Sequence, residues 1–171
     1  MKTPTPHGLI AATLVPLLLL GARPTTERGR VGGTFTMTYT DQHPIPVADA
    51  EGHALLATTS SGTNRSTGPT PYMDGADVSN AEIADLVQGN GPHQGYVTVS
   101  HNGAIQVSKW AGKVTTVLGS DKQPVTTFKG TWTNVKGPTG HGVYKGRITG
   151  PKTYTVDWQG ELDLQSQTSS R

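Results

Sequence analysis

Apolar and polar positions alternate without a break from Tyr154 to Leu164. Threonine, aspartate, glutamine and glutamate occupy the odd positions. The even positions hold Tyr154, Val156, Trp158, Gly160, Leu162 and Leu164. Successive side chains of a strand point to opposite faces, so this pattern predicts a strand with one row in a core and the other in water. A helix would spread the same apolar residues around its whole circumference.

A second segment, residues 34–41, alternates in the same way. Phe35, Met37 and Tyr39 fall on one side and four threonines on the other. Threonine suits the outer row because its β-branched side chain fits an extended backbone. Weaker patterns of the same kind predict further strands over residues 54–60, 125–135 and 143–149.

Two apolar runs, residues 96–100 and 104–107, flank the dipeptide Asn102-Gly103. Asn-Gly readily adopts the two positive φ angles of a type I′ turn, which predicts a β-hairpin. Beyond the turn the apolar positions change from odd to even numbers. One extra residue inserted near 108–110 would produce this change, so we expect a β-bulge there.

Residues 77–88 fit two structures. Ser79 and Glu82 have the spacing of a helix capping box, but the segment also fits an irregular strand. Residues 63–75 are rich in threonine, proline and glycine, which predicts a long loop. The chain thus predicts an all-β fold: a single antiparallel barrel of about eight strands, or alternatively a β-sandwich, with or without one short helix near 79–88.

The first residues resemble an export signal. Lys2 precedes the 12-residue apolar run Leu9–Leu20, which is shorter than the roughly 20 residues of a membrane-spanning helix. We therefore expect a signal peptide over residues 1–22, cleaved near Gly21-Ala22, and a secreted or periplasmic protein with no stable membrane span after cleavage. We expect a flexible leader over 23–33, the barrel domain over 34–165 and a disordered tail over 166–171.

Composition narrows the function classes. The chain contains no cysteine, which excludes disulfides, thiolate nucleophiles and cysteine-bound zinc. Its 22 glycines and 12 prolines suit strands joined by tight turns. The net charge is only +2, and the basic residues are scattered rather than clustered. We therefore expect no nucleic-acid partner.

The segment from Gly130 to Leu162 resembles the closing hairpins of the allene oxide cyclase and dirigent type of barrel. These domains carry a G-T-W/F strand, a Gly-Thr-Gly turn, a G-x-Y-x-G strand and a final aromatic strand. Gly130, Trp132, Gly137, Gly140, Gly142, Tyr144, Gly146, Tyr154 and Trp158 occupy the corresponding places. Residues 89–96 are similar to a segment of uncharacterised exported members. The chain departs from the pattern between Lys136 and Gly142, where it is about eight residues short, so the resemblance does not extend to the loop there or to any pocket that this loop walls. Because the chain has no matching site motif, the resemblance implies a fold and no catalytic residue.

Three groups of polar residues are candidates for chemistry. Asp49, Glu51 and His53 share one side of an extended backbone, as a weak metal cluster requires, although a solvated turn explains them as well. Asp85 and His93 flank a glycine-rich segment and are a candidate acid–base pair at a barrel mouth. Asn64 begins a glycosylation acceptor sequence in the expected loop. We expect no metal and no cofactor.

Large aromatic residues on the predicted strands either line a ligand cavity or fill the barrel. An eight-stranded interior is just wide enough for its own side chains, which favours filling. The candidate ligand-binding residues are Tyr39, Asp85, His93, Trp110, Trp132 and Tyr144. The leading hypothesis is an exported barrel that binds a small apolar or amphipathic ligand, or a protein partner, without catalysis. The alternatives are a cyclase or isomerase acting on a lipid-like or phenolic substrate, and a structural envelope protein.

Overall fold

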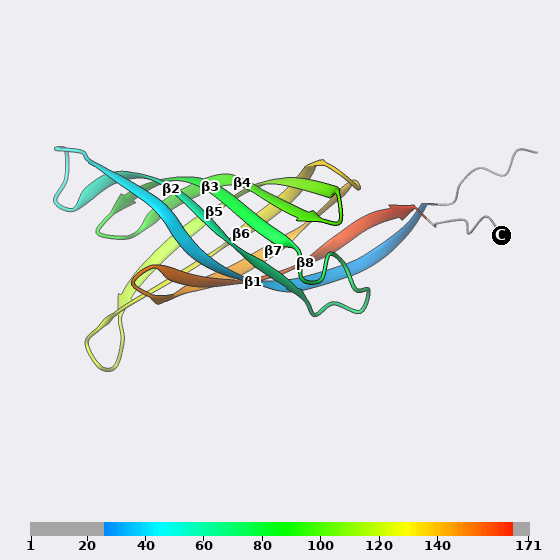
Figure 1. The fold of residues 1–171 in the computed structure, drawn as a ribbon. Coiled ribbons are helices and arrows are strands. Elements are labelled where there is room, and N and C mark those ends of the chain that lie inside the picture. The colour runs from blue at the N-terminus through cyan, green and yellow to red at the C-terminus, as the bar shows by residue number, and fades with distance from the viewer. Residues whose placement is uncertain (1–25, 166–171) are drawn as a thin grey trace, which may run out of the picture.

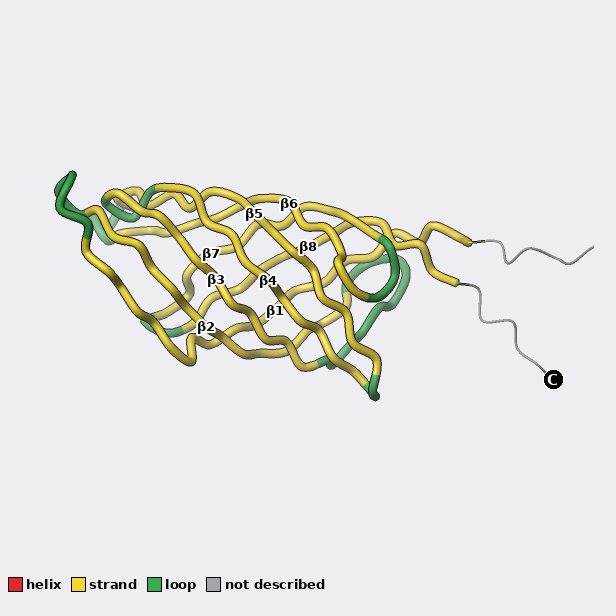
Figure 2. Tube along the Cα trace, turned by 90° about the horizontal axis from the view of Figure 1, so that it is seen from above, coloured by secondary structure: helices red, strands yellow, loops and turns green. Residues whose placement is uncertain are grey.

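The computed structural model describes residues 26–165 as one closed antiparallel barrel. Each strand pairs with its sequence neighbours, so the chain runs up and down around the barrel (Figures 1 and 2). The strands are β1 (Thr26–Pro46), β2 (His53–Ser66), β3 (Asp77–Val87), β4 (Gly91–His101), β5 (Ala104–Leu118), β6 (Pro124–Lys136), β7 (Gly140–Gly150) and β8 (Thr153–Gln165). The predicted all-β fold of eight antiparallel strands is confirmed.

Pairing of the first strand with the last closes the barrel and rules out the sandwich alternative. The β1–β8 ladder extends from Thr26 opposite Gln165 to Thr38 opposite Thr153. Residues 26–33, which we expected to belong to a flexible leader, form the first part of this ladder instead. Their backbone groups form hydrogen bonds with β8. The polar, glycine-rich composition of this segment does not show that such a partner strand exists. The predicted signal peptide (1–22) and the predicted tail (166–171) lie outside the described residues.

The two clearest sequence patterns have the predicted orientation. In β8, Tyr154, Trp158 and Leu162 are buried, with Leu162 only 1% exposed. In β1, Met37 is equally buried. Asn102 and Gly103 both have positive φ, 49° and 83°, and join β4 to β5 as predicted for a type I′ hairpin.

Residues 77–87 form strand β3 and contain no helix. β3 is hydrogen-bonded to β2 on one side and to β4 on the other, so its backbone groups are satisfied by two ladders. Ser79 is exposed whereas Glu82 faces inward, as alternation requires. The capping-box spacing therefore has no structural role here.

The predicted bulge lies on the neighbouring strand. β5 keeps one phase throughout: Gln106, Ser108 and Trp110 all face inward, and Ile105 is exposed. The extra residue is Val135 of β6, because Val107 pairs with Lys136 while Ser108 pairs with Asn134. The apparent phase change in the sequence comes from polar residues that face the interior.

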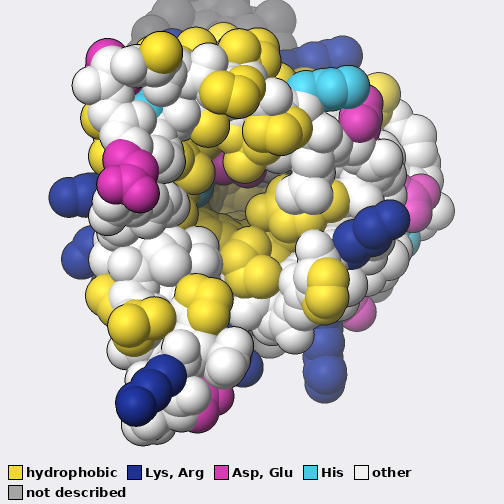
Figure 3. Space-filling view, turned by 90° about the vertical axis from the view of Figure 1, so that its left-hand side faces the viewer, with side chains coloured by type: hydrophobic (Ala, Val, Ile, Leu, Met, Phe, Trp, Pro, Cys, Tyr) yellow, Lys and Arg dark blue, Asp and Glu magenta, His cyan; other side chains and the backbone are white. Residues whose placement is uncertain are grey.

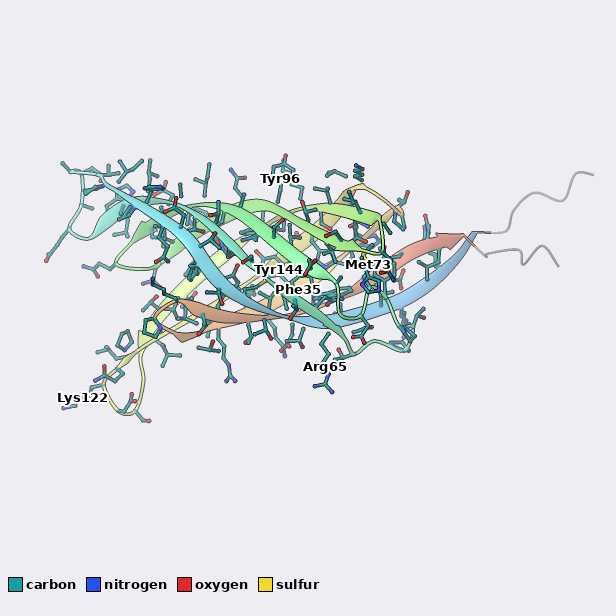
Figure 4. The ribbon with its side chains drawn as sticks, viewed as in Figure 1. Phe35, Arg65, Met73, Tyr96, Lys122 and Tyr144 are labelled. Carbon is teal, nitrogen blue, oxygen red and sulfur yellow. The ribbon has the colours of Figure 1, made fainter. Side chains whose placement is uncertain are left out.

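The two ends of the barrel differ. The loop 67–76 packs into the end where β1 begins and β8 finishes, and places Tyr72 and Met73 against the aromatic core (Figure 4 labels Met73). The opposite end carries the β1–β2, β3–β4, β5–β6 and β7–β8 turns. Seen from that side, the barrel is hollow and its opening is bordered by hydrophobic side chains (Figure 3). We call this opening the mouth.

The connection between β6 and β7, which we expected to be short, is a tight turn of residues 137–139. Gly137 has a φ of 95°, which favours glycine. The turn lies at the end opposite the mouth, and the Thr139 carbonyl accepts a hydrogen bond from the amide of Asp163. This connection therefore forms no wall of the mouth.

Candidate functional site

A cavity of about 330 Å³ occupies the centre of the barrel. Side chains from all eight strands line it, together with Tyr72, Met73 and Pro151 from the connections. Its volume falls at the lower end of the range of small-molecule pockets, roughly 300–1,000 Å³. The expectation that aromatic residues fill the barrel is therefore wrong, because they line a hollow at its centre.

Glycines on neighbouring strands make the space for these aromatic rings. A Cβ atom at Gly112 would lie 2.5 Å from the hydroxyl oxygen of Tyr144, and one at Gly130 would lie 2.6 Å from it. These two glycines therefore let the Tyr144 side chain cross β5 and β6 on the inner surface. Figure 4 shows Tyr144 and Phe35 within the barrel, whereas Tyr96 and Arg65 project outward.

A buried chain of three side chains forms the most polar part of the cavity wall. Nδ1 of His93 lies 2.8 Å from a carboxylate oxygen of Glu82, and Nε2 lies 3.1 Å from the hydroxyl of Tyr144. The side chains of His93 and Glu82 are 3% and 15% exposed. The imidazole also packs edge-on against Trp110 and Phe128.

The acceptor groups determine where the protons lie in this chain. A carboxylate only accepts hydrogen bonds, so Nδ1 of His93 carries the proton that it donates to Glu82. In the neutral imidazole Nε2 then accepts, and the Tyr144 hydroxyl donates to it. Glu82, His93 and Tyr144 thus form a continuous path along which a proton can shift.

The negative charge of Glu82 affects three tyrosines. Burial raises the pKa of Tyr39 and of Tyr144, and the charge of Glu82 raises each further. Burial also raises the pKa of Tyr154 to about 12, although a hydrogen bond from Ser60, 2.5 Å away, opposes this shift. These phenols stay protonated and serve as neutral hydrogen-bonding groups at neutral pH.

Two further polar networks brace the wall. In the first, Asn80 accepts a 2.9 Å hydrogen bond from Nε1 of Trp110 and donates to the hydroxyl of Tyr154. In the second, the Tyr72 hydroxyl donates to Gln106 at 2.7 Å, and the chain continues through Ser108 to Asn134. This second network explains why polar residues of β5 face the interior, and it ties the loop to the barrel.

One buried donor in the cavity wall has no partner. Nε1 of Trp132 makes no hydrogen bond to any described residue. The indole rings of Trp132 and Trp158 meet edge to face, with centroids 6.1 Å apart. A buried unpaired N–H costs about 1–3 kcal/mol, so this indole is a local source of instability in the wall.

Five of the six predicted ligand-binding residues line the cavity: Tyr39, His93, Trp110, Trp132 and Tyr144. Asp85 does not. It lies on the outer face of β3, where its carboxylate oxygen is 2.7 Å from Nε2 of His53. The proposed Asp85–His93 pair is therefore wrong, because odd-numbered residues of β3 face solvent.

Glu82, and not Asp85, is the carboxylate that pairs with His93. Glu82 was not identified from the sequence. It shares the even-numbered inner row of β3 with the buried Val78 and Ala84. That parity is the signal that could have found Glu82. We did not use this alternation, because residues 77–88 also fitted a helix and no inward-facing row was assigned to them.

The candidate metal cluster of Asp49, Glu51 and His53 is not formed, and His53 lies between two aspartates instead. Asp49 and Asp85 hydrogen-bond to the two ring nitrogens of His53, and Glu51 takes no part. The two carboxylates raise the pKa of His53, and the hydrogen bond from His53 lowers the pKa of Asp49. Within residues 26–165, no group of three histidine, cysteine, aspartate or glutamate side chains is arranged to hold a metal ion.

Asn64 lies in the barrel interior rather than in a surface loop, and its side chain is 2% exposed. Its amide nitrogen donates to the carbonyls of Tyr72 and Met73, at 3.2 and 2.7 Å. Its oxygen accepts from Nε1 of Trp158. The role of Asn64 in the folded protein is therefore to hold the loop, and the acceptor sequence is not displayed there.

Comparison of the chain with protein-family models, with curated proteins and with solved structures gives no significant match. Within the part of the chain that the structure describes, no helix has the length and apolar character of a membrane span.

Proposed function

We propose that this barrel binds one small, largely apolar molecule in its central cavity and holds a polar group of that molecule against Glu82, His93 and Tyr144. The observation that carries the proposal is the cavity itself, which opens at one end and has a buried polar chain in a largely apolar wall. Apolar pockets with a few convergent polar groups are typical of small-molecule sites.

The tryptophans supply a direct assay. All three tryptophans of the chain, Trp110, Trp132 and Trp158, line the cavity. A neutral fluorescent naphthalene probe, N-phenyl-1-naphthylamine, should therefore quench tryptophan emission and gain fluorescence by energy transfer when it binds.

A matched pair of variants locates the binding site. Ala84 is buried and lines the cavity, whereas Ala81 lies on the outer row of the same strand. Ala84→Phe fills the cavity and should weaken probe binding at least tenfold, while Ala81→Phe should leave it unchanged. Equal effects of the two variants, or no saturable binding by the wild type, would contradict the proposal.

A second candidate function is catalysis by proton transfer, as in a cyclase or isomerase acting on a lipid-like or phenolic substrate. The Glu82–His93–Tyr144 path supports it, because general acid–base catalysis requires such groups beside a bound substrate. The resemblance to allene oxide cyclase and dirigent barrels points to the same substrate classes. Chiral analysis of the products from an unsaturated fatty-acid epoxide tests it: racemic products at the uncatalysed rate contradict it.

We also propose that the protein acts outside the cytoplasm, on the strength of the apolar run Leu9–Leu20 behind Lys2. Expression of the full chain followed by N-terminal sequencing of the exported product tests this. We expect a new terminus near residue 22, and retention of Met1 in a cytoplasmic product contradicts it.

A further inference from the structure

In the described part of the chain, the cavity lining contains an acidic side chain but no lysine or arginine to balance its charge. Glu82 is the only carboxylate among the described side chains that line it. The one basic side chain in the lining is His93, whose Nδ1 donates to Glu82 and whose Nε2, in the neutral imidazole, accepts from Tyr144. With the imidazole neutral, the wall carries one negative charge without a positive partner.

The second oxygen of Glu82, Oε2, is free for a ligand. His93 occupies Oε1, and no described residue hydrogen-bonds to Oε2. Glu82 belongs to the cavity lining, and Oε2 is not among the described side-chain atoms that are both buried and unpaired, so it keeps accessible surface.

Aromatic rings surround the carboxylate. Tyr39, Tyr144 and Tyr154 are close enough for the charge of Glu82 to act on their hydroxyl groups. The rings of Tyr39 and Tyr154 lie 4.8 Å apart, centroid to centroid. The face of an aromatic ring carries partial negative charge and attracts cations. The rings and the carboxylate therefore both favour a positively charged ligand group.

We infer that the ligands of this cavity are amphipathic amines, in which a protonated amino group binds Oε2 of Glu82 and an apolar group fills the aromatic hollow. The inference rests on the proposed function, since it names the ligand class of the same site. An ammonium group loses hydration on entry, and a charge-assisted hydrogen bond together with the aromatic faces replaces it. A carboxylic acid of the same size would meet an unpartnered like charge.

Three ligands with one hydrocarbon chain test the inference: octylamine, octan-1-ol and octanoate. Their dissociation constants are measured by calorimetry with the full barrel at about pH 7, where an alkylamine is protonated. We expect octylamine to bind at least about tenfold more tightly than octan-1-ol, and octanoate to bind most weakly.

Glu82→Gln is the decisive variant, because glutamine keeps the size and the hydrogen bond from His93 but removes the charge. It should reduce the preference for octylamine over octan-1-ol to about onefold, mainly by weakening the binding of octylamine. Asp85→Asn, on the outer face of the same strand, removes a charge outside the cavity and should preserve the preference.

The outcomes separate the two proposals. If octan-1-ol and the naphthalene probe bind but octylamine binds no more tightly, or if Glu82→Gln keeps the preference, the amine inference is wrong and the proposed function stands. If no octyl compound and no probe binds, the proposed function fails and the amine inference fails with it. A circular dichroism spectrum identical to wild type confirms that each variant is folded.

Discussion

Nε1 of Trp158 donates a 3.1 Å hydrogen bond to Oδ1 of Asn64, from β8 to β2 over Gly33 of the strand between them, β1. The amide nitrogen of the same asparagine holds two carbonyls of the loop 67–76. One side chain thus joins the aromatic core to the segment that closes the barrel.

Replacing this asparagine should be costly. Asn64→Ala leaves the indole N–H of Trp158 and the carbonyls of Tyr72 and Met73 without partners, in a region sealed from water. We expect a loss of about 2–4 kcal/mol in the free energy of unfolding, measured by urea denaturation. Arg65→Ala, at the neighbouring exposed position, is the control and should change stability by less than about 0.5 kcal/mol. Similar losses in the two variants would contradict this role.

Space for the Tyr144 hydroxyl depends on Gly112. A Cβ atom there would lie 2.5 Å from that hydroxyl and closer still to the carbonyl oxygen of Lys129. Gly112→Ala should therefore destabilise the barrel by about 1–3 kcal/mol or more and displace Tyr144 from His93. Thermal unfolding measures the first effect and the NMR shifts of the His93 ring the second. Lys113→Ala, on the outer row, should alter neither.

The alkaline limit of stability should follow the buried phenols. Folding raises the pKa of Tyr154 to about 12, against about 10 in an unfolded chain. Because the folded value is higher, the contribution is complete below about pH 10 and is lost as the pH rises through the folded value. Absorbance at about 295 nm should show Tyr39, Tyr144 and Tyr154 titrating above the ordinary range, with unfolding as they ionise. Titration of all five tyrosines near pH 10 without unfolding would refute this.

His53 should titrate above an ordinary histidine, because Asp49 and Asp85 hydrogen-bond to its two nitrogens. The stability that this arrangement adds is fully present below the unfolded value of about 6.5 and is lost as the pH rises through the folded pKa. Imidazole NMR shifts recorded against pH measure the effect. Asp85→Asn should lower the pKa of His53, and an unchanged titration curve in this variant would show that the geometry is not maintained in solution.

The sequence predicted the strands whose two faces differ sharply in polarity. Residues 34–41 and 154–164 are apolar inside and polar outside, so their alternation was enough. β3 and β5 were harder because polar residues face inward in both. Asn80 and Glu82 are on the inward-facing row of β3, and Gln106 and Ser108 are on the inward-facing row of β5. Their hydrogen-bond partners come from distant strands, and no local pattern contains that information.

The candidate site shows the same limit. The candidate aromatic residues do line the cavity: Tyr39, Trp110, Trp132 and Tyr144. Their size and position alone favoured filling of the barrel, because the space left between rings depends on the packing of all eight strands. The carboxylate was misassigned by three residues, because choosing Glu82 over Asp85 requires knowing that β3 is a strand and which row faces in. That choice also decides which histidine each acid contacts: His93 inside for Glu82, and His53 outside for Asp85.

The β1–β8 ladder has a practical consequence for studying the protein. Because Thr26 pairs with Gln165, both ends of the described chain leave the barrel side by side, on the side away from the mouth (Figure 1). An affinity tag, a fluorescent fusion or a solid support joined directly after Gln165 therefore starts on the side away from the entrance. Immobilised protein presents its binding chamber to the surrounding liquid in a uniform direction, which suits this barrel to surface-based screening of candidate ligands.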